Sequence, residues 1–433
     1  DDDDRKILGQ FIDKAKARIE GVTISDETDP ANINVGEVVA KQEDVDKLKE
    51  EIKIAETTFN NPNATKEFIN KAKARIEQAI IDFKTIEGEK VNENADEYTA
   101  EDFVIEGSAI KGFTDSGLKK LNANAQVLNI PKFDGVNEIA MNAFANKGIK
   151  VLEIPGNIET ISTNAFLKNG ITKLTLKEGL KHVKSNAFFG NNIKNLTIPG
   201  TLNDVEANAF RQCNIVNLTF TDGVTMIGES AFTENSINNI VFPKTLKGID
   251  LGAFKSNLVQ DVDFPDGLEV IAPKIFCRNK IMEVTVPNSL KVFCGNSFRF
   301  NPGFEGDSIF KISLRDPITI DSLDGKAIEE KLSEVVELRP YIFKGHIKDE
   351  KTALGIDSWE LVESKDGIST YSAKFEQIST EKLNSLLGPN KSDGTSNETV
   401  QEILKKIILF VKVKVSAEDL GMWNEDVFTV EGN

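Results

Sequence analysis

The sequence predicts a multidomain protein with an N-terminal three-helix module, a central solenoid of 22-residue coils with parallel strands, and a small C-terminal α+β domain. Three observations support this fold class. A phenylalanine recurs at 22-residue intervals from Phe144 to Phe298. Two near-identical amphipathic decapeptides, FIDKAKARIE and FINKAKARIE, precede the repeats, and beyond Asp316 the period stops. We therefore predict four segments: module 5–87, acidic linker 88–100, solenoid 101–316 and C-terminal domain 317–433.

The N-terminal segment carries three amphipathic stretches. The decapeptides lie within 5–20 and 63–86, and an apolar stripe at spacings of three and four predicts a helix between them (Val45, Leu48, Ile52, Ala55, Phe59). The stretch from Phe11 to Phe83 resembles the FIVAR helical modules of Gram-positive surface proteins. It departs from their usual pattern near Val35 to Val39, where an aromatic residue is common. The resemblance implies a spacer or an accessory binding unit.

The central repeat reads N-x-I-x-x-L-x-I-P-x-x-L-x-x-I-x-x-N-A-F. Its apolar residues recur too widely for one continuous helix, while the L-x-I alternation is typical of a short strand. We predict a coil that turns through a strand, a bend and a single helical or 3₁₀ turn, each apolar column stacking on its copy in the next coil. About nine strands are expected, from the segment containing Leu128 to the one containing Ile312.

The repeats over roughly residues 103–314 resemble leucine-rich repeats of the BspA-like, or Treponema pallidum, type. Strand leucine, post-strand proline and the Ala-Phe pair recur in one phase. The resemblance implies a leucine-rich-repeat solenoid that binds other molecules. Together with the FIVAR resemblance, it implies a secreted protein at the bacterial cell surface or in the cell wall. The export signal and the anchor are expected outside this sequence, and no direct membrane insertion is expected, because the longest apolar run, IILFV at 407–411, is far too short.

The C-terminal segment predicts a small α+β domain of no recognised family. A helix is expected in AIEEKLSEVVEL, strands around Trp359–Val362, Tyr371–Phe375 and Val411–Val415, and a loop at 388–399.

The charge distribution disfavours two classes of partner. The net charge is −17, divided as about −9 in 1–100, about 0 in 101–316 and about −8 in 317–433. A neutral centre between acidic flanks lacks the basic footprint of a nucleic-acid binder, and the same charge disfavours anionic membranes. The three cysteines, Cys213, Cys277 and Cys294, show no zinc spacing, and we interpret them as buried core residues.

No enzyme motif is evident. The two histidines, His182 and His346, have no Ser, Cys or carboxylate motif to pair with, and there is no phosphate loop, dinucleotide fingerprint or H-E-x-x-H. We therefore predict a protein that is not an enzyme and that has no cofactor and no metal.

A column of asparagines follows the phenylalanines by three residues (Asn169, Asn191, Asn235, Asn257, Asn279 and Asn301), with Lys147 and Cys213 as exceptions. We interpret it as structural, because a buried asparagine can bond backbone groups that a turn leaves unpaired.

Ligand-binding residues are expected in the columns that vary. Positions seven and nine after each phenylalanine flank the buried strand leucine and point outward, because side chains alternate along a strand. The candidate residues are Lys173, Thr175, Asn195, Thr197, Asn217, Thr219, Asn239, Asp261, Asp263 and Glu283. Val151 and Glu153 begin the two ladders, and Asp261, Asp263 and Glu283 are expected to cluster at the acidic end. In the structural alternative, threonine merely suits an exposed strand and the charges keep it soluble.

The leading functional hypothesis is a cell-surface adhesin that uses the strand face to bind a host protein, a matrix component or a glycan. The alternative is a structural stalk or surface-layer spacer, in which the binding unit lies elsewhere.

Overall fold

A computed structural model describes residues 2–88, 90, 97–294, 296–304, 308–321, 325–336, 338–341, 355–375, 379, 381 and 397–415. The chain forms two compact units, Asp1–Thr219 with Glu234–Asn239, and Phe220–Thr233 with Ile240–Asn433. In the described ranges, no helix combines the length and the apolar character needed to cross a membrane.

The first unit begins with the predicted three helices, α1 (Asp2–Ile19), α2 (Gln42–Asn60) and α3 (Lys66–Asp82). Their apolar faces bury one small core, as the three-and-four spacing predicts (Leu8, Phe11, Ala15, Val45, Leu48, Ile52, Ile69, Ile76 and Ile80). The Thr65 hydroxyl caps α3 by accepting from the Phe68 N–H. A small sheet of β1 (Val22–Ile24), β2 (Val38–Ala40) and β3 (Ile86–Glu87) adjoins the helices. It was not predicted, and β2 lies where the FIVAR pattern is interrupted.

Most of the predicted linker, residues 89 and 91–96, lies outside the described residues. The first coils follow a 3₁₀ turn, η2 (Ala100–Asp102), a hairpin of β4 (Phe103–Glu106) and β5 (Ala109–Phe113), and the helix α4 (Asp115–Ala123). A second 3₁₀ turn, η1 (Pro30–Asn32), lies in the module, and a third, η3 (Pro302–Phe304), follows the last regular coil.

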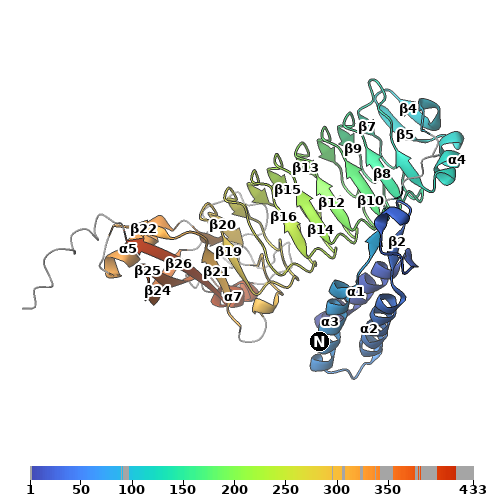
Figure 1. The fold of residues 1–433 in the computed structure, drawn as a ribbon. Coiled ribbons are helices and arrows are strands. Elements are labelled where there is room, and N and C mark those ends of the chain that lie inside the picture. The colour runs from blue at the N-terminus through green and yellow to red at the C-terminus, as the bar shows by residue number, and fades with distance from the viewer. Residues whose placement is uncertain are drawn as a thin grey trace, which may run out of the picture. The chain divides into compact units, whose positions relative to one another are not determined.

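All but one of the coils carry the predicted short strand, and paired neighbouring strands run parallel (Figure 1). The register offset is one repeat, with Val151 opposite Lys173 in the first unit. The strands are β6 (Val127–Asn129), β8 (Val151–Ile154), β10 (Lys173–Leu176), β12 (Asn195–Ile198), β14 (Asn217–Phe220), β16 (Asn239–Val241), β19 (Glu283–Val286) and β21 (Phe310–Leu314).

One expected strand is missing from this series. Residues 261–264, in the position of the L-x-I alternation, form no strand. Asp261 and Asp263 occupy both outward positions there, and aspartate is disfavoured in strands.

A second series of very short strands was not predicted. In the first unit these are β7 (Glu138–Ile139), β9 (Thr160–Ile161), β11 (His182–Val183) and β13 (Asp204–Val205), which extend the hairpin of β4 and β5. In the second unit they are β15 (Met226–Ile227), β17 (Gly248–Ile249), β18 (Val270–Ile271) and β20 (Val292–Cys294). After each strand of this second series the chain forms a run of turns, whereas a helical or 3₁₀ turn was expected there. That expectation was wrong, because two positions per coil adopt positive φ, which interrupts any helix.

The phenylalanine column is the core of every coil. Phe144, Phe166, Phe188, Phe210, Phe232, Phe254, Phe276 and Phe298 are all buried. Within the first unit the rings of Phe188 and Phe210 are stacked at 5.0 Å, and within the second unit those of Phe254 and Phe276 at 5.3 Å. The predicted stacking of each column on its own copy is therefore confirmed.

The asparagine column is structural, as interpreted from the sequence. The Asn191 Oδ1 accepts from the backbone N–H groups of Asn169, Gly170 and Ile171, at 3.0–3.2 Å. Its Nδ2 donates to the carbonyl of Phe166 at 3.0 Å. Each such asparagine thus satisfies backbone groups of the preceding coil.

The C-terminal elements are β22 (Ile318–Ile320), α5 (Gly325–Val335), β23 (Arg339–Tyr341), β24 (Ile356–Lys365), β25 (Ile368–Phe375), α7 (Asn397–Lys405) and β26 (Ile407–Val415). They include the predicted helix and strands. β26 pairs in parallel with β21 and antiparallel with β25, so these strands continue a sheet that begins in the coils. The predicted loop at 388–399 lies outside the described residues except for its end, where α7 already begins.

Candidate functional site

The strand face of the first unit presents most of the sequence-predicted ligand residues. Lys173, Asn195 and Thr197 are exposed, and Thr175, Asn217 and Thr219 are half-buried. Asn239, at the start of β16, is also exposed. The side-chain amide of Asn217 donates to the Oδ1 of Asn195 at 2.7 Å, so successive coils are linked along one ladder. The outward alternation expected of these strands is present.

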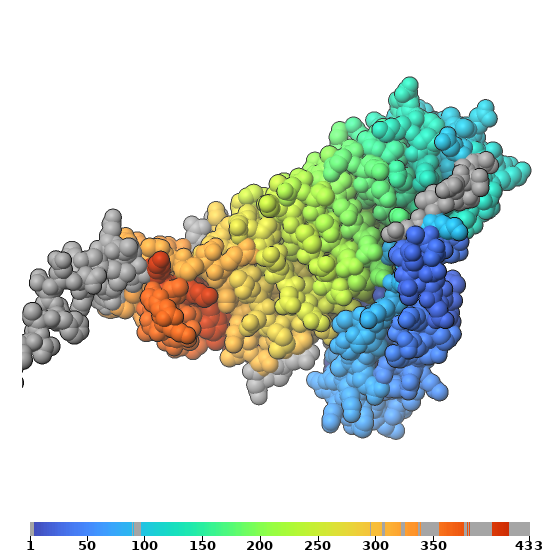
Figure 2. All heavy atoms as spheres, viewed as in Figure 1, coloured from blue at the N-terminus to red at the C-terminus, as the bar shows by residue number. Residues whose placement is uncertain are grey.

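The N-terminal module covers part of this face, which the sequence did not indicate. The Thr172 hydroxyl donates to the Gly36 carbonyl at 3.2 Å. Farther along, the Lys194 ammonium donates to the Thr85 carbonyl at 3.1 Å. The Asn195 amide donates to the Glu87 carboxylate at 3.1 Å. In Figure 2 the blue atoms of the module lie against the green atoms of the coils.

Val151 shows the consequence of this docking. It was expected to point outward into solvent, but it is buried. A Cβ added to Gly36 would lie 2.7 Å from the Val151 Cγ2, so the glycine backbone rests directly on that side chain. Gly36 has a φ of +87°, which also favours glycine at this position. The expectation for Val151 was therefore wrong because a distant segment covers it.

Two cations and one carboxylate lie at this contact. Burial lowers the pKa of Lys194, the charge of Arg18 lowers it further, and Glu87 opposes both effects. Burial also lowers the pKa of Arg18, again opposed by Glu87. The Arg18 guanidinium donates to the Phe83 carbonyl at 3.3 Å. The negative charge of Glu87 therefore favours the charged forms of Arg18, in the module, and Lys194, in the coils.

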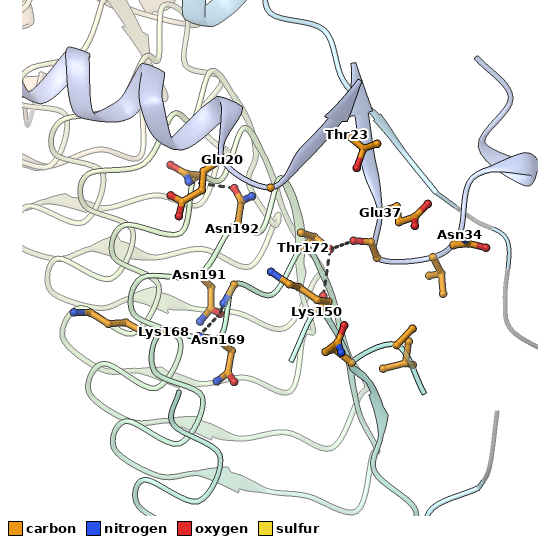
Figure 3. A pocket seen from close by; sticks show the side chains of 18 of the residues that line it. Glu20, Thr23, Asn34, Glu37, Lys150, Lys168, Asn169, Thr172, Asn191 and Asn192 are labelled. Atoms are coloured by element: carbon orange, nitrogen blue, oxygen red, sulfur yellow. Dashed lines mark hydrogen bonds between the residues drawn. The ribbon is translucent and has the colours of Figure 1, made fainter. Parts of the chain in front are cut away.

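A cavity of about 1500 Å³ lies beside this contact, between the module and the turns that precede the strands. Figure 3 shows Glu20, Thr23, Asn34 and Glu37 on the module side and Lys150, Lys168, Thr172 and Asn192 on the coil side. Gln126, Asn129, Gln212, Asn214, Lys90 and the edge of Phe189 complete much of the wall. Amide and hydroxyl groups dominate this wall.

Two buried asparagines at the cavity wall are already committed. Asn169 and Asn191 use their side chains for backbone groups, as the dashed lines in Figure 3 indicate for Asn191. The charged lining residues are Glu20, Glu37, Lys90, Lys150 and Lys168, so neither sign of charge dominates strongly. The groups available to a ligand are therefore mainly the neutral amides and hydroxyls.

None of the ten sequence-predicted residues lines the cavity. Most of the coil-side wall comes instead from positions one to six after the core phenylalanines from Phe144 to Phe210, just before the strands. Residues at these positions vary between coils, as Lys168, Asn192 and Gln212 show, and this variation could have indicated a binding surface. The module side could not be found from the sequence, because it requires the fold to bring residues 20–37 beside residues 124–214.

The acidic end of the ladders, in the second unit, is not a bare carboxylate cluster. The Arg315 guanidinium pairs with Asp263 at 2.9 Å and with Asp266 at 2.5 Å. Asp261 and Glu283 are exposed. In the part of the chain that the structure describes, no three His, Cys, Asp or Glu residues are grouped to hold a metal ion. Arg315, which the sequence prediction overlooked, changes the chemistry of this end from acidic to salt-bridged.

The three cysteines are buried and form no disulfide, as interpreted from the sequence. Burial raises the pKa of the Cys213 thiol to about 12, which keeps it protonated and unreactive at neutral pH.

Comparisons with known proteins identify the repeats. A family model for the BspA type leucine rich repeat region matches residues 113–225 and 181–305, in six copies. No curated protein sequence matches the chain. The chain is similar to the structure of a leucine rich cell surface protein from Faecalibacterium prausnitzii, at 15% identity and a TM-score of 0.34, covering 50% of this chain and 70% of that one.

Two further structures are similar at this level. One is a leucine-rich repeat protein from Bacteroides ovatus, at 20% identity and a TM-score of 0.32, covering 51% of this chain and 63% of that one. The other is the pneumococcal vaccine antigen PcpA, at 13% identity and a TM-score of 0.21, covering 54% of this chain and 93% of that one. The chain thus spans less than two thirds of the Bacteroides protein.

Proposed function

We propose, from the premise that residues 113–305 are a BspA-type leucine-rich repeat region, that the protein is a bacterial cell-surface binding protein. Its ligand is an extracellular glycan or an extended protein segment. The observation that carries this proposal is the cavity of about 1500 Å³, which is large enough for a ligand of several sugar rings or residues. The cavity leads to the exposed strand ladders, because Thr172 lines it and Lys173 begins the next strand.

The chemistry of the wall favours a neutral, hydroxyl-rich or amide-rich ligand. Each side-chain amide offers both donors and acceptors, which sugar hydroxyls and peptide groups require in pairs. Asn34, Gln126 and Asn192 supply such groups from both sides of the cavity. Phe189 adds an apolar edge against which a sugar or an aliphatic side chain can pack. The balanced charges of the wall give no strong preference for an ionic ligand.

The FIVAR resemblance fits the same proposal. A helical module that forms one wall of the site acts as an accessory binding unit, and it does more than separate the repeats from the cell surface. The proposal is binding without catalysis, because the sequence carries no recognisable enzyme motif.

The test is binding of the full chain to arrays of glycans and purified matrix proteins. One variant changes the cavity wall, Asn192→Lys, and a second changes the ladder, with Asn195, Asn217 and Asn239 all replaced by lysine. The control, Asn203→Lys, adds the same charge at an exposed position outside both surfaces. We expect the cavity variant to weaken binding by about tenfold or more and the control to leave it unchanged.

Two outcomes would count against the proposal. If the wild-type chain bound no array component, the stalk alternative would be preferred. If binding survived both variants, the ligand would bind elsewhere on the chain.

A further inference from the structure

β24 is a long strand at the edge of its sheet. Its ten residues, Ile356–Lys365, make it the longest strand in the described ranges, where it pairs only with β25 (Figure 1). The backbone groups that point away from β25 therefore have no strand partner among those residues. Proteins usually keep an edge strand short or place proline in it, because an exposed edge can pair with another extended chain. The β24 edge, the outward side of Ile356–Lys365, is long and has no proline.

One face of β24 packs against α5. Residues that lie opposite each other in an antiparallel pair point to the same face of the sheet. Trp359 lies opposite the buried Ala373. Leu361 lies opposite the buried Tyr371. The Trp359 Nε1–H donates to the hydroxyl of Ser333, on α5, at 3.1 Å, so the helix covers the face that Trp359 and Leu361 share.

Two carboxylates occupy the opposite face of β24. Glu360 lies opposite Ser372. Glu363 lies opposite Thr370, because the register shifts at Val362, which is an extra residue on β24. Ser372 and Thr370 are two residues apart on β25 and therefore point to the same face. Glu360 and Glu363, both exposed, thus form a pair of successive carboxylates on that face.

Apolar side chains are exposed beside these carboxylates. The side chains of Leu361 and Val362 are 57% and 54% exposed. The Lys374 ammonium lies 3.8 Å from the Glu360 carboxylate, but both side chains are mostly exposed, so this ion pair contributes little. The β24 edge therefore offers a partner an apolar side chain on one face and two carboxylates on the other.

A second copy of the chain does not fit this edge. In a two-fold antiparallel pair, residues of the two copies that lie opposite each other point to the same face. Centring the pair on Leu361 would place Glu360 opposite Glu363 of the second copy. Centring it on either glutamate would place that residue opposite itself, and centres nearer the ends would leave much of the strand unpaired. Like charges opposite each other destabilise a strand pair, so the carboxylates oppose self-association.

We propose that the β24 edge binds an extended segment of another protein, in which basic and apolar residues alternate. Such a segment would add a strand to the sheet through backbone hydrogen bonds. Its basic side chains would face Glu360 and Glu363, and its apolar side chains would face Leu361 on the other face. The same carboxylates thus exclude a second copy and select a basic partner.

This surface is independent of the function proposed above. It lies within the second unit, and it shares no residue with the cavity or with the strand ladders. Failure of one proposal therefore leaves the other unaffected.

The experiment measures fluorescence anisotropy of a labelled nonapeptide that alternates lysine and valine, titrated with the full chain. A control peptide carries glutamate in place of every lysine. Two further peptides carry backbone N-methyl groups, one on every valine and the other on every lysine. Successive N–H groups of a strand point to opposite edges, so each methylated peptide blocks one edge and leaves the other intact.

The protein variants test the two faces separately. The first combines Glu360→Lys with Glu363→Lys. Its matched control combines Glu330→Lys with Glu402→Lys, which makes the same change of charge at exposed positions on α5 and α7. The second variant, Leu361→Thr, removes the apolar contact with a residue that suits a strand. Thermal unfolding midpoints show whether each variant keeps its fold.

We expect the double glutamate variant to weaken binding of the lysine-valine peptide by about tenfold or more, and its control by less than about twofold. The double glutamate variant should instead prefer the glutamate-valine peptide. Leu361→Thr should weaken binding by about threefold. One methylated peptide should lose binding to the wild type, and the other should keep it.

Several results would overturn the proposal. It fails if the wild type does not prefer the lysine-valine peptide to the glutamate-valine peptide, or if the double glutamate variant binds like the wild type. Equal binding of the two methylated peptides would show that the peptide adds no strand, and this result does not depend on any protein variant. Wild-type binding by Leu361→Thr would refute the apolar contact. A wild-type dimer in sedimentation velocity that Leu361→Thr weakened would assign the edge to a second copy.

Discussion

The thiol of Cys213 donates to the backbone carbonyl of Phe188 at 3.0 Å, where neighbouring coils of the repeat place an asparagine amide. Cysteine can replace the donor of that amide, but its sulfur is a much weaker acceptor for backbone N–H groups than an amide oxygen. The coil that contains Phe188 therefore has a weaker hydrogen-bond acceptor than the one that the coil before it receives from Asn191.

Replacing Cys213 by asparagine is expected to stabilise the protein. The added Oδ1 can accept from backbone N–H groups of the preceding coil, and one such bond contributes about 1 kcal/mol to the free energy of unfolding. Denaturant unfolding measures the change. Cys277→Asn is the control, because Cys277 is buried outside the asparagine column, and the same substitution there should destabilise. A lower midpoint for Cys213→Asn would show that the column does not act through this acceptor.

Replacing Phe210 by alanine should cost about 3–5 kcal/mol, because the ring is fully buried and stacks on Phe188 at an interplanar angle of 5°. Phe68→Ala is the matched control. Phe68 is 63% exposed, so its loss should change the free energy of unfolding by less than about 0.5 kcal/mol. An unchanged midpoint for the Phe210 variant would mean that the 22-residue phase has been assigned incorrectly.

Asn186 occupies a left-handed turn position, with φ of +57°. Alanine there should cost about 1 kcal/mol, since its Cβ is disfavoured in this region, whereas glycine should cost little or nothing. Comparing the thermal midpoints of Asn186→Ala and Asn186→Gly separates the backbone effect from loss of the amide. Equal destabilisation by both would assign the asparagine a side-chain role instead.

Asp102 predicts a pH dependence. It is 1% exposed, and it accepts from Lys120 at 2.7 Å, from the Thr99 N–H at 2.8 Å and from the Ser116 hydroxyl at 3.0 Å. Burial raises its pKa, but these hydrogen bonds outweigh that effect and hold the pKa below its usual value. A lowered folded-state pKa stabilises the protein above the unfolded-state value of about 4, and this stabilisation is lost as pH falls through the folded-state value.

The test compares thermal unfolding of the wild type and Asp102→Asn from pH 7 to pH 2. At pH 7 the variant should lose about 3 kcal/mol, because Lys120 loses its buried partner. The difference should shrink below about pH 4, because the Asp102 carboxylate of the unfolded wild type begins to bind protons there before that of the folded protein does. A constant difference across this range would contradict the assigned ionisation.

Gly36→Val should detach the module from the strand face. The added atoms would collide with Val151, and positive φ disfavours valine. A Thr172→Cys reporter keeps Val151 in place and lies buried beside Gly36, so it should react slowly with iodoacetamide when Gly36 is intact and faster with Gly36→Val. Gly21→Val is the control, because Gly21 also has positive φ but has no neighbour within 4 Å. Equal labelling in both backgrounds would place the module contact elsewhere.

The apolar columns of the repeat and the longer helices were predictable, whereas the second strand series and the small N-terminal sheet were not. The phenylalanine, leucine and asparagine columns recur in one phase, so a single coil indicates what the others do. The second strand series escaped prediction because its strands have only two or three residues, such as Glu138–Ile139, which are too few to show alternation. The strand expected at 261–264 is absent because Asp261 and Asp263 break the local pattern.

The candidate site illustrates a different limit. The outward ladder around Asn195 followed from strand alternation, but the docked module and the cavity depend on contacts between residues far apart in sequence. Thr172 and Gly36 are separated by 136 residues, and Lys194 and Thr85 by 109. No periodic signal links such pairs. The local patterns predict most of the longer elements, and only the assembled fold shows which faces remain open.

The asparagine column also gives the stack of coils a direction. Asn169 completes the turn of the coil before it, and the backbone of its own coil depends on Asn191 in the next coil along the chain. Removing coils from the N-terminal side leaves a spare side-chain amide that water can satisfy. Removing them from the C-terminal side leaves backbone N–H groups without their acceptor. Truncation should therefore be tolerated better from the front of the repeat array than from its end, and new coils can be added without disruption only in whole 22-residue steps.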